Sequence, residues 1–242
     1  MMISISHLTK IYPGTKTPSV EKISLNVKKG EVFGFLGPNG AGKTTTVKMM
    51  MGLMRPTSGK ISILDSTPED FRVKTKIGFL PENPYFYQYL TAVEFLEMCA
   101  NIFGIPRVKI QKKIGESLLS VHLKKEAWNT KIRTYSKGMQ QRLGLAQALI
   151  NNPELVVLDE PMAGLDPLGR KEVKDIILNL KKNGKTVFFN SHILSDVEDL
   201  CDHAAIIDRG KIILDDTVKV ITKNYTIPLE EVFVSIITQK RT

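Results

Sequence analysis

A glycine-rich loop at residues 37–45 is the sequence feature that most restricts what this chain can fold into. Its residues match the pattern GxxxxGK[ST], which grips the β- and γ-phosphates of nucleotides. The apolar residues 32–36 before it are typical of a buried strand, and residues 44–51 after it favour a helix. Glycines let successive backbone N–H groups point inward at an anion, and the helix adds the positive end of its dipole. This context predicts a phosphate-binding loop inside an α/β core.

The residues of this loop have distinct expected roles. We expect Lys43 to place a point charge beside the phosphates and the Thr44 hydroxyl to bind Mg²⁺. Backbone amides supply the remaining contacts. The expected nucleotide-contacting residues are Gly37, Pro38, Asn39, Gly40, Ala41, Gly42, Lys43, Thr44 and Thr45.

The composition excludes several classes of protein. With 242 residues, 42% of them hydrophobic and 24% charged, the chain has the composition of a soluble globular protein. No apolar run approaches the ~18–20 residues that span a bilayer, and no secretory signal is visible at the start of the sequence. Cys99 and Cys201 lie far apart, so we expect no disulfide framework or zinc site, and a reducing cytoplasm fits.

The net charge of +9 is spread along the chain rather than focused in one tract. We interpret it as a solvated, lysine-rich surface, with proximity to anionic lipid as the main alternative.

The hydrophobic pattern divides the chain into a strand-rich core and a helical insert. Short β-rich segments occur before residue 84 and again after residue 152, and the later ones are fully apolar, as in a buried parallel sheet. Between them, residues 91–149 have a helical pattern, with Thr91 as an N-cap. We predict a nucleotide-binding core (1–83 and 153–216), a helical subdomain (84–152) and a short C-terminal extension (217–242) with a helix over 228–237. The predicted strands cover residues 3–8, 24–27, 32–36, 60–64, 76–80, 155–158, 186–189 and 204–207.

Two carboxylates, Asp159 and Glu160, directly follow the apolar residues 155–158. A buried strand would deliver them to the carboxyl edge of the sheet, where ligands bind in open α/β folds. There Asp159 would hold Mg²⁺ and Glu160 would orient or deprotonate the attacking water. An acidic pair at a strand end is a weak signal alone, but its position downstream of a phosphate loop strengthens it.

These motifs together resemble the ATP-binding subunits of ABC transporters, over nearly the whole chain to about residue 216. Residues 135–139, Tyr-Ser-Lys-Gly-Met, are similar to the family signature LSGGQ, whose serine and backbone amides cap the nucleotide held by a second subunit. Residues 163–166 look like the family's D-loop. The resemblance therefore implies nucleotide contacts from Ser136, Gly138 and Asp166.

Three further residues match the family in order along the chain. His192 looks like the switch histidine that contacts the γ-phosphate, Tyr12 sits where an aromatic ring stacks on adenine, and Glu82 occupies the Q-loop position. Three of the site residues have a plainer alternative: His192 as a structural histidine, Tyr12 packed against its own loop, and Ser136 as a helix N-cap. The resemblance implies that Lys43, Glu160 and His192 are catalytic, and that Thr44, Asp159 and Glu82 hold the metal.

The sequence departs from the family pattern at Lys137 and Met139 in the signature and at Glu82, where the family has glutamine. Lys137 could reach a partner's nucleotide or point to solvent. An ionised Glu82 offers only acceptors, and our hypothesis is that it senses Mg²⁺ as an anionic ligand.

Three tyrosines, Tyr85, Tyr87 and Tyr89, follow within a few residues of Glu82. In the family this region leads into the groove that receives a short helix from the membrane subunit. The rings could form an aromatic surface for that partner or pack within the helical insert.

The resemblance implies an α/β phosphate-loop NTPase core with a mixed, mainly parallel sheet, an N-terminal antiparallel part and an inserted helical subdomain. It further implies an ATPase that uses ATP and Mg²⁺, pairs with a second copy or a homologous subunit, and drives an integral membrane permease on a separate chain. We expect it in the cytoplasm, peripheral on the inner face of the membrane through the permease, with no nucleic acid bound.

The tail at 228–233 is similar to that of exporters with ABC-2-type membrane partners. An importer subunit is the first alternative. An ABC ATPase acting on nucleic acid or the ribosome and an unrelated kinase or GTPase are the others.

Overall fold

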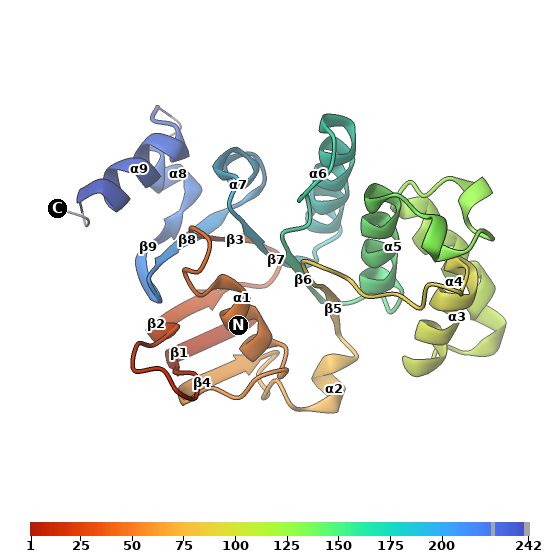
Figure 1. Cartoon of the computed structure of the whole chain (residues 1–242), viewed down its shortest axis with the longest axis horizontal. Helices are drawn as coiled ribbons and strands as arrows, with labels where there is room; N and C mark the ends of the chain where they lie inside the picture. The colour runs from red at the N-terminus through yellow and green to blue at the C-terminus, as the bar shows by residue number, and fades with distance from the viewer. Residues whose placement is uncertain (224–225, 240–242) are drawn as a thin grey trace.

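The computed structural model describes residues 1–223 and 226–239, which form two sheets with helices around them (Figure 1). The larger sheet has the strand order β5-β6-β7-β3-β8-β9. Its first five strands are parallel and β9 is antiparallel to β8, so the predicted mixed, mainly parallel sheet is confirmed. The strands are β3 (Val32–Leu36), β5 (Ile77–Leu80), β6 (Leu155–Asp159), β7 (Thr186–Ser191), β8 (His203–Asp208) and β9 (Lys211–Thr217).

The smaller sheet is antiparallel and comes from the N-terminal part of the chain, as predicted. Its central strand β1 pairs with both β2 and β4. Side chains from this sheet, from α1 and from one face of β3 share a single apolar core. The elements are β1 (Ile3–Lys10), β2 (Val20–Val27), β4 (Ser58–Ile63) and α1 (Lys43–Met50).

The predicted strand at residues 24–27 was too short, because β2 begins at Val20. The alternation that reveals a strand is broken at Lys22, whose φ of 48° lies in the left-handed region. The register against β1 shifts between the pair Leu8–Ile23 and the pair Lys10–Val20. An irregularity of this kind changes which side chains face the core, and it hides the strand from a period-two pattern.

Helices fill the chain between β5 and β6 (Figure 1, yellow to green). The first begins at Thr91 through a capping box: the Thr91 side chain accepts a hydrogen bond from the Glu94 amide, and the Glu94 carboxylate accepts one from the Thr91 amide. Two short 3₁₀ turns, with Trp128 between them, connect α4 to α5. The elements are α3 (Ala92–Ile102), α4 (Arg107–Ser120), η1 (Lys125–Ala127), η2 (Ile132–Thr134) and α5 (Lys137–Leu149).

Helices α6 and α7 follow β6 and β7 of the large sheet and lie on the face opposite the small sheet (Figure 1). The C-terminal helix α9 packs on α7, and the Leu229 amide donates a hydrogen bond to the Glu198 carboxylate of α7. None of the helices in the described part of the chain has the length and apolar composition needed to cross a bilayer. The elements are α2 (Phe71–Lys74), α6 (Pro167–Lys182), α7 (Leu194–Leu200), α8 (Val218–Ile221) and α9 (Leu229–Gln239).

Candidate functional site

The phosphate loop connects β3 to α1 and needs glycine at two close approaches. A Cβ on Gly37 would lie 2.3 Å from the carbonyl oxygen of Ile207, and a Cβ on Gly42 would lie 2.5 Å from that of Ser19. Gly42 also has a φ of 111°, which L side chains rarely adopt. Because α1 has no side-chain cap, its first backbone amides are available to an anion.

Lys43 is buried inside this loop. Its ammonium donates to the carbonyl oxygens of Gly37 at 2.6 Å and Pro38 at 3.3 Å, and it lies 3.9 Å from Oε1 of Glu160. Burial lowers the pKa of Lys43, while the charges of Glu160, Asp159 and Glu82 act in the opposite direction. The loop therefore holds its cation next to the acidic residues.

The carboxyl ends of β5, β6, β7 and β3 lie in that order along one edge of the sheet. Asp159 ends β6 and is paired in register with Asn190 of β7, whose Nδ2 donates to the Asp159 carboxylate at 2.8 Å. Burial raises the pKa of Asp159, and the neighbouring charges of Glu82 and Glu160 raise it further. Asn190 is a site residue that the sequence analysis missed, although a polar residue closing an apolar strand was a usable signal.

Glu160 lies between Lys43 and His192. Its Oε2 is 2.9 Å from Nδ1 of His192, which is half-exposed just beyond the end of β7. The backbone of Glu160 has a φ of 53°, in the left-handed region. A non-glycine residue in that region is strained, and strained residues of this kind concentrate at functional sites.

Most of the loop residues, together with Glu160 and His192, line one cavity of about 400 Å³, a volume within the range of small-molecule sites, whereas Asp159 and Gly37 lie outside its lining. It brings together the loop, Glu82, Glu160 and His192. The lining residues are Ser19, Pro38, Asn39, Gly40, Ala41, Gly42, Lys43, Thr44, Thr45, Glu82, Glu160, Ala163 and His192.

Tyr12 lies beside this cavity rather than in its lining. Its hydroxyl is 3.2 Å from the Thr45 hydroxyl of α1, and the Lys10 ammonium lies 5.7 Å from the centre of its ring. The ring is half-buried next to the start of α1, and a flat aromatic ring is the kind of group on which a base can stack.

Ser136, Gly138 and Asp166 line a different cavity, of about 680 Å³, that shares no residue with the first. Ser136 caps α5 by accepting from the Met139 amide at 3.3 Å, and Asp166 caps α6 by accepting from the Gly169 amide at 2.8 Å. The structure therefore does not bring the signature residues to the phosphate loop of their own chain.

Lys137 lies against its own 163–166 loop. A Cβ on Gly164 would be 2.5 Å from the Lys137 ammonium nitrogen. Gln141, which is buried, donates from Nε2 to the Pro161 carbonyl oxygen at 2.8 Å. Helix α5 therefore contacts the segment after Glu160 through both Lys137 and Gln141.

The residues expected to hold Mg²⁺ provide carboxylate and hydroxyl oxygens, the donors this ion prefers. The described part of the chain contains no group of three or more His, Cys, Asp or Glu side chains that could enclose a metal ion by themselves. That arrangement fits Mg²⁺, which is usually held by one or two carboxylates together with substrate phosphates and water.

Comparison with known proteins identifies the family. The family model described as ABC transporter matches residues 20–163, which include the phosphate loop, the signature segment and Glu160. The chain belongs to the ABC transporter family. The family and fold expected from the motifs are confirmed.

Relatives of this ABC family member include an ABC transporter ATP-binding protein of Nostoc sp., 50% identical over 218 residues that make up 88% of this chain and 65% of that protein. The bacitracin transport ATP-binding protein BcrA of Bacillus licheniformis is 45% identical over 218 residues, covering 88% of this chain and 68% of BcrA. The chain spans 65% and 60% of the lengths of the Nostoc and Synechocystis relatives.

Among solved structures, the chain resembles the dimeric ATP-binding cassette MJ0796 in a post-hydrolysis state bound to ADP and Pi. The TM-score is 0.82 with 26% sequence identity, over 90% of this chain and 99% of that one.

Proposed function

We propose that this chain binds and hydrolyses ATP as one member of a pair, and that closure of the pair drives a separate integral membrane permease, in the direction of export. The observation that carries the proposal is the placement of Glu160 between Lys43 and His192 at the edge of the phosphate-loop cavity. A carboxylate held by a cation on one side and an imidazole on the other is suited to act on a water molecule beside a phosphate.

In the proposed reaction the loop amides and Lys43 hold the β- and γ-phosphates and offset the charge that develops on them. Glu160 accepts a proton from the attacking water. His192 orients Glu160 through its Nδ1 contact, and the rest of its ring reaches the terminal phosphate. Tyr12 stacks on the adenine ring of ATP. Mg²⁺, when bound by Thr44, Asp159 and Glu82, supplies further charge compensation at the phosphates.

A pair of copies is proposed because the signature residues lie apart from the loop. Ser136, Gly138 and Asp166 face a separate cavity at the exposed start of α5 and α6. Apart from the Met139 amide, which donates to Ser136, the first amides of α5 are suited to a phosphate held by the loop of another copy. The dimeric form of the MJ0796 cassette supports this arrangement.

The membrane partner is proposed to dock on the surface formed by Tyr85, Tyr87 and Tyr89. These three side chains are 88%, 61% and 75% exposed, whereas the neighbouring Phe86 is buried against Phe95. The rings therefore do not pack within the helical part, and they border a largely apolar cavity of about 410 Å³. Exposed aromatic clusters of this kind are typical of protein interfaces.

Export is favoured over import because a relative named for fluoroquinolone export, from Mycobacterium tuberculosis, is 39% identical over 219 residues. Within this proposal the chain lies on the cytoplasmic face of the membrane through its permease, and residues 84–152 act as the helical subdomain between the two parts of the core.

The direct test of hydrolysis is phosphate release from ATP by the purified chain and its Glu160→Gln variant. We expect the variant to lose about 10²–10⁴-fold in kcat while still binding ATP. Glu154→Gln, at an exposed ion pair with Lys76 just before β6, is the matched control and should keep full activity. Equal rates for the wild type and Glu160→Gln would refute the proposed role of Glu160.

A further inference from the structure

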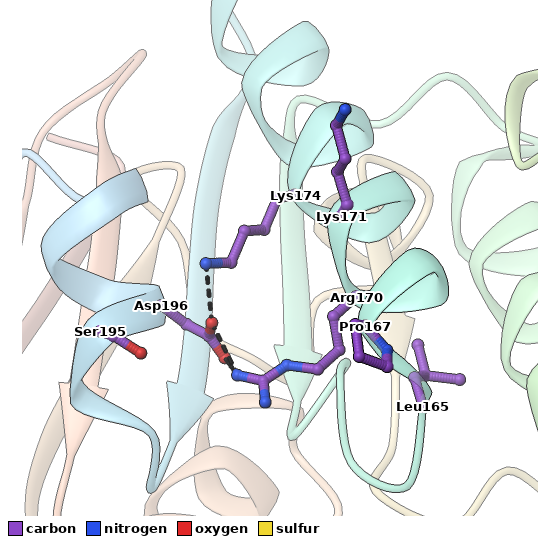
Figure 2. A pocket seen from close by; sticks show the side chains of 7 residues that line it. All are labelled: Leu165, Pro167, Arg170, Lys171, Lys174, Ser195 and Asp196. Carbon is purple, nitrogen blue, oxygen red and sulfur yellow. Dashed lines mark hydrogen bonds and ion pairs between the residues drawn. The ribbon is translucent and has the colours of Figure 1, made fainter.

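Ion pairs connect the first part of α6, from Arg170 to Lys174, with the first turn of α7, and Asp196 is at their centre (Figure 2). Asp196 is fully buried although it carries a carboxylate. Arg170 donates from one nitrogen to both oxygens of Asp196 at 2.9 Å, and the Lys174 ammonium lies 2.9 Å from Oδ1. Figure 2 shows both cations of α6 directed at this one carboxylate of α7.

Each of these helices continues directly from a segment of the candidate site. Helix α7 begins two residues after His192, and α6 begins immediately after Asp166, which caps it. The Arg170 amide donates to the Asp166 carbonyl oxygen at 2.9 Å, so Arg170 belongs to the first turn of α6. The Arg170–Asp196 pair therefore joins the loop that follows Glu160 to the segment that carries His192.

The apolar contacts of α7 keep it on the sheet without fixing its direction. Val197 and Leu200 are buried, and a Cβ on Gly34 of β3 would lie 2.7 Å from a methyl carbon of Val197. Hydrophobic burial is non-directional, whereas charge-assisted hydrogen bonds to a carboxylate fix geometry. Later in the helix, Glu198 still accepts from the Leu229 amide, and Asp202 beyond it is bonded to Val32 of β3. Loss of the Asp196 ion pairs should therefore leave α7 attached to the sheet while its first turn, next to His192, is free to shift.

We infer that Asp196 is a positioning residue: through Arg170 and Lys174 it sets the place of α7, and thereby of the His192 ring, relative to Glu160. A buried ion pair contributes little net stability compared with an apolar pair of the same size, so a role in fixing geometry accounts for it better than a role in stability. The effect on catalysis rests on the proposed ATPase function, and the effect on His192 does not.

The kinetic test compares Asp196→Asn with Asp199→Asn. Asp199 is an exposed partner of Lys174 on the same pair of helices, so its variant removes an α6–α7 ion pair without touching the buried carboxylate. We expect Asp196→Asn to lower kcat about ten- to a hundredfold, with KM for ATP within about twofold, because His192 is misplaced while the phosphate loop is intact. Asp199→Asn should match the wild type, and Asp196→Glu should recover part of kcat.

The second readout does not require hydrolysis. The NMR signals of the His192 ring are assigned by comparison with His192→Gln. In Asp196→Asn these signals should move toward their positions in Glu160→Gln, because both variants disturb the contact between His192 and the Glu160 carboxylate. In Asp199→Asn they should stay at their wild-type positions. If the wild type hydrolyses no ATP, the proposed function fails while this comparison still tests the inference. Arg170→Gln, which retains Lys174, replaces Asp196→Asn if that variant does not fold. The inference is overturned if the His192 signals stay at their wild-type positions in folded Asp196→Asn or Arg170→Gln, or if Asp199→Asn moves them equally.

Discussion

Single residues determine the charge balance of the site. Asp159, Glu160 and Glu82 all act electrostatically on the one ammonium of Lys43. Burial is the largest cause of the raised pKa of Asp159, and the charges of Glu82 and Glu160 raise it further, because one buried cation does not balance three carboxylates. A divalent cation would relieve the repulsion, which is the physical basis for expecting Mg²⁺ here.

The first prediction concerns Glu82. Glu82→Gln replaces an anionic oxygen donor by a neutral amide, so the apparent affinity of the ATPase for Mg²⁺ should fall several-fold at saturating ATP. Rates measured across a Mg²⁺ titration give that affinity, with Glu154→Gln as a control of the same chemistry outside the cavity. An unchanged apparent affinity would show that Glu82 is not a metal ligand.

The second prediction concerns pH and stability without nucleotide or metal. The pKa of the Asp159 carboxyl is raised in the folded state, so the folded state binds the carboxyl proton more tightly than the unfolded state does. The free energy of unfolding therefore falls as pH rises from the ordinary pKa of aspartate through the raised pKa of Asp159. Asp159→Asn should therefore raise Tm at pH 7, because the neutral amide does not carry the charge that burial disfavours. The gain should vanish below about pH 4, the ordinary pKa of aspartate.

Thermal unfolding followed by circular dichroism at several pH values measures this difference. Asp175→Asn, at an exposed position of α6, is the control and should leave Tm unchanged. A lower Tm of Asp159→Asn at pH 7 would mean that ionised Asp159 stabilises the fold.

Elements place these residues, and the strand order explains why the sequence could locate most of them. The fully apolar runs of β6 and β7 mark buried parallel strands, so the residues directly after them had to meet at the carboxyl edge. Asp159, Glu160 and His192 were predictable in this way. Three tertiary features were not predictable from the sequence: the Asn190 hydrogen bond to Asp159, the contact of Lys137 with Gly164, and the burial of Asp196. They depend on which elements become neighbours in the fold, and no local sequence pattern specifies that.

The third prediction concerns the glycine that joins the loop to α1. Gly42→Ala adds a Cβ that meets the Ser19 carbonyl oxygen, so the loop must shift and ATP affinity should fall at least about tenfold, equivalent to about 1.4 kcal/mol. Gly184→Ala is the control, because Gly184 also has a positive φ but a Cβ there meets nothing within 4 Å. Titration with a fluorescent ATP analogue compares the two, and equal affinities would contradict the close-packed loop.

At the scale of the whole molecule, one chain presents three separate surfaces: the phosphate-loop cavity, the signature cavity and the tyrosine surface of residues 85–89. None is complete alone in the proposed function. In that function the first two would complete each other across a pair of copies, and the third would take a partner of different chemistry.

The fourth prediction concerns the tyrosine surface. The double variant Tyr85→Ala, Tyr87→Ala should lose co-purification with the membrane permease when the two are co-expressed, because large exposed rings supply most of the energy at such interfaces. ATP binding by the isolated chain should be unchanged. Phe71→Ala, at a 72% exposed ring on α2, is the control and should still co-purify. Assembly and ATP-driven transport that survive the double variant would exclude this surface as the docking site.

The central claim is that two copies share each ATP, and the mass of Glu160→Gln in solution tests it most directly. With ATP and Mg²⁺, light scattering after size exclusion should show a particle of twice the 27.1 kDa chain mass, and without nucleotide it should show the single chain. Adding Gly138→Asp, which places a carboxylate against the expected position of the partner's phosphate, should keep the protein monomeric while its own loop still binds ATP. A Glu160→Gln protein that stays at 27.1 kDa at saturating ATP would contradict the account.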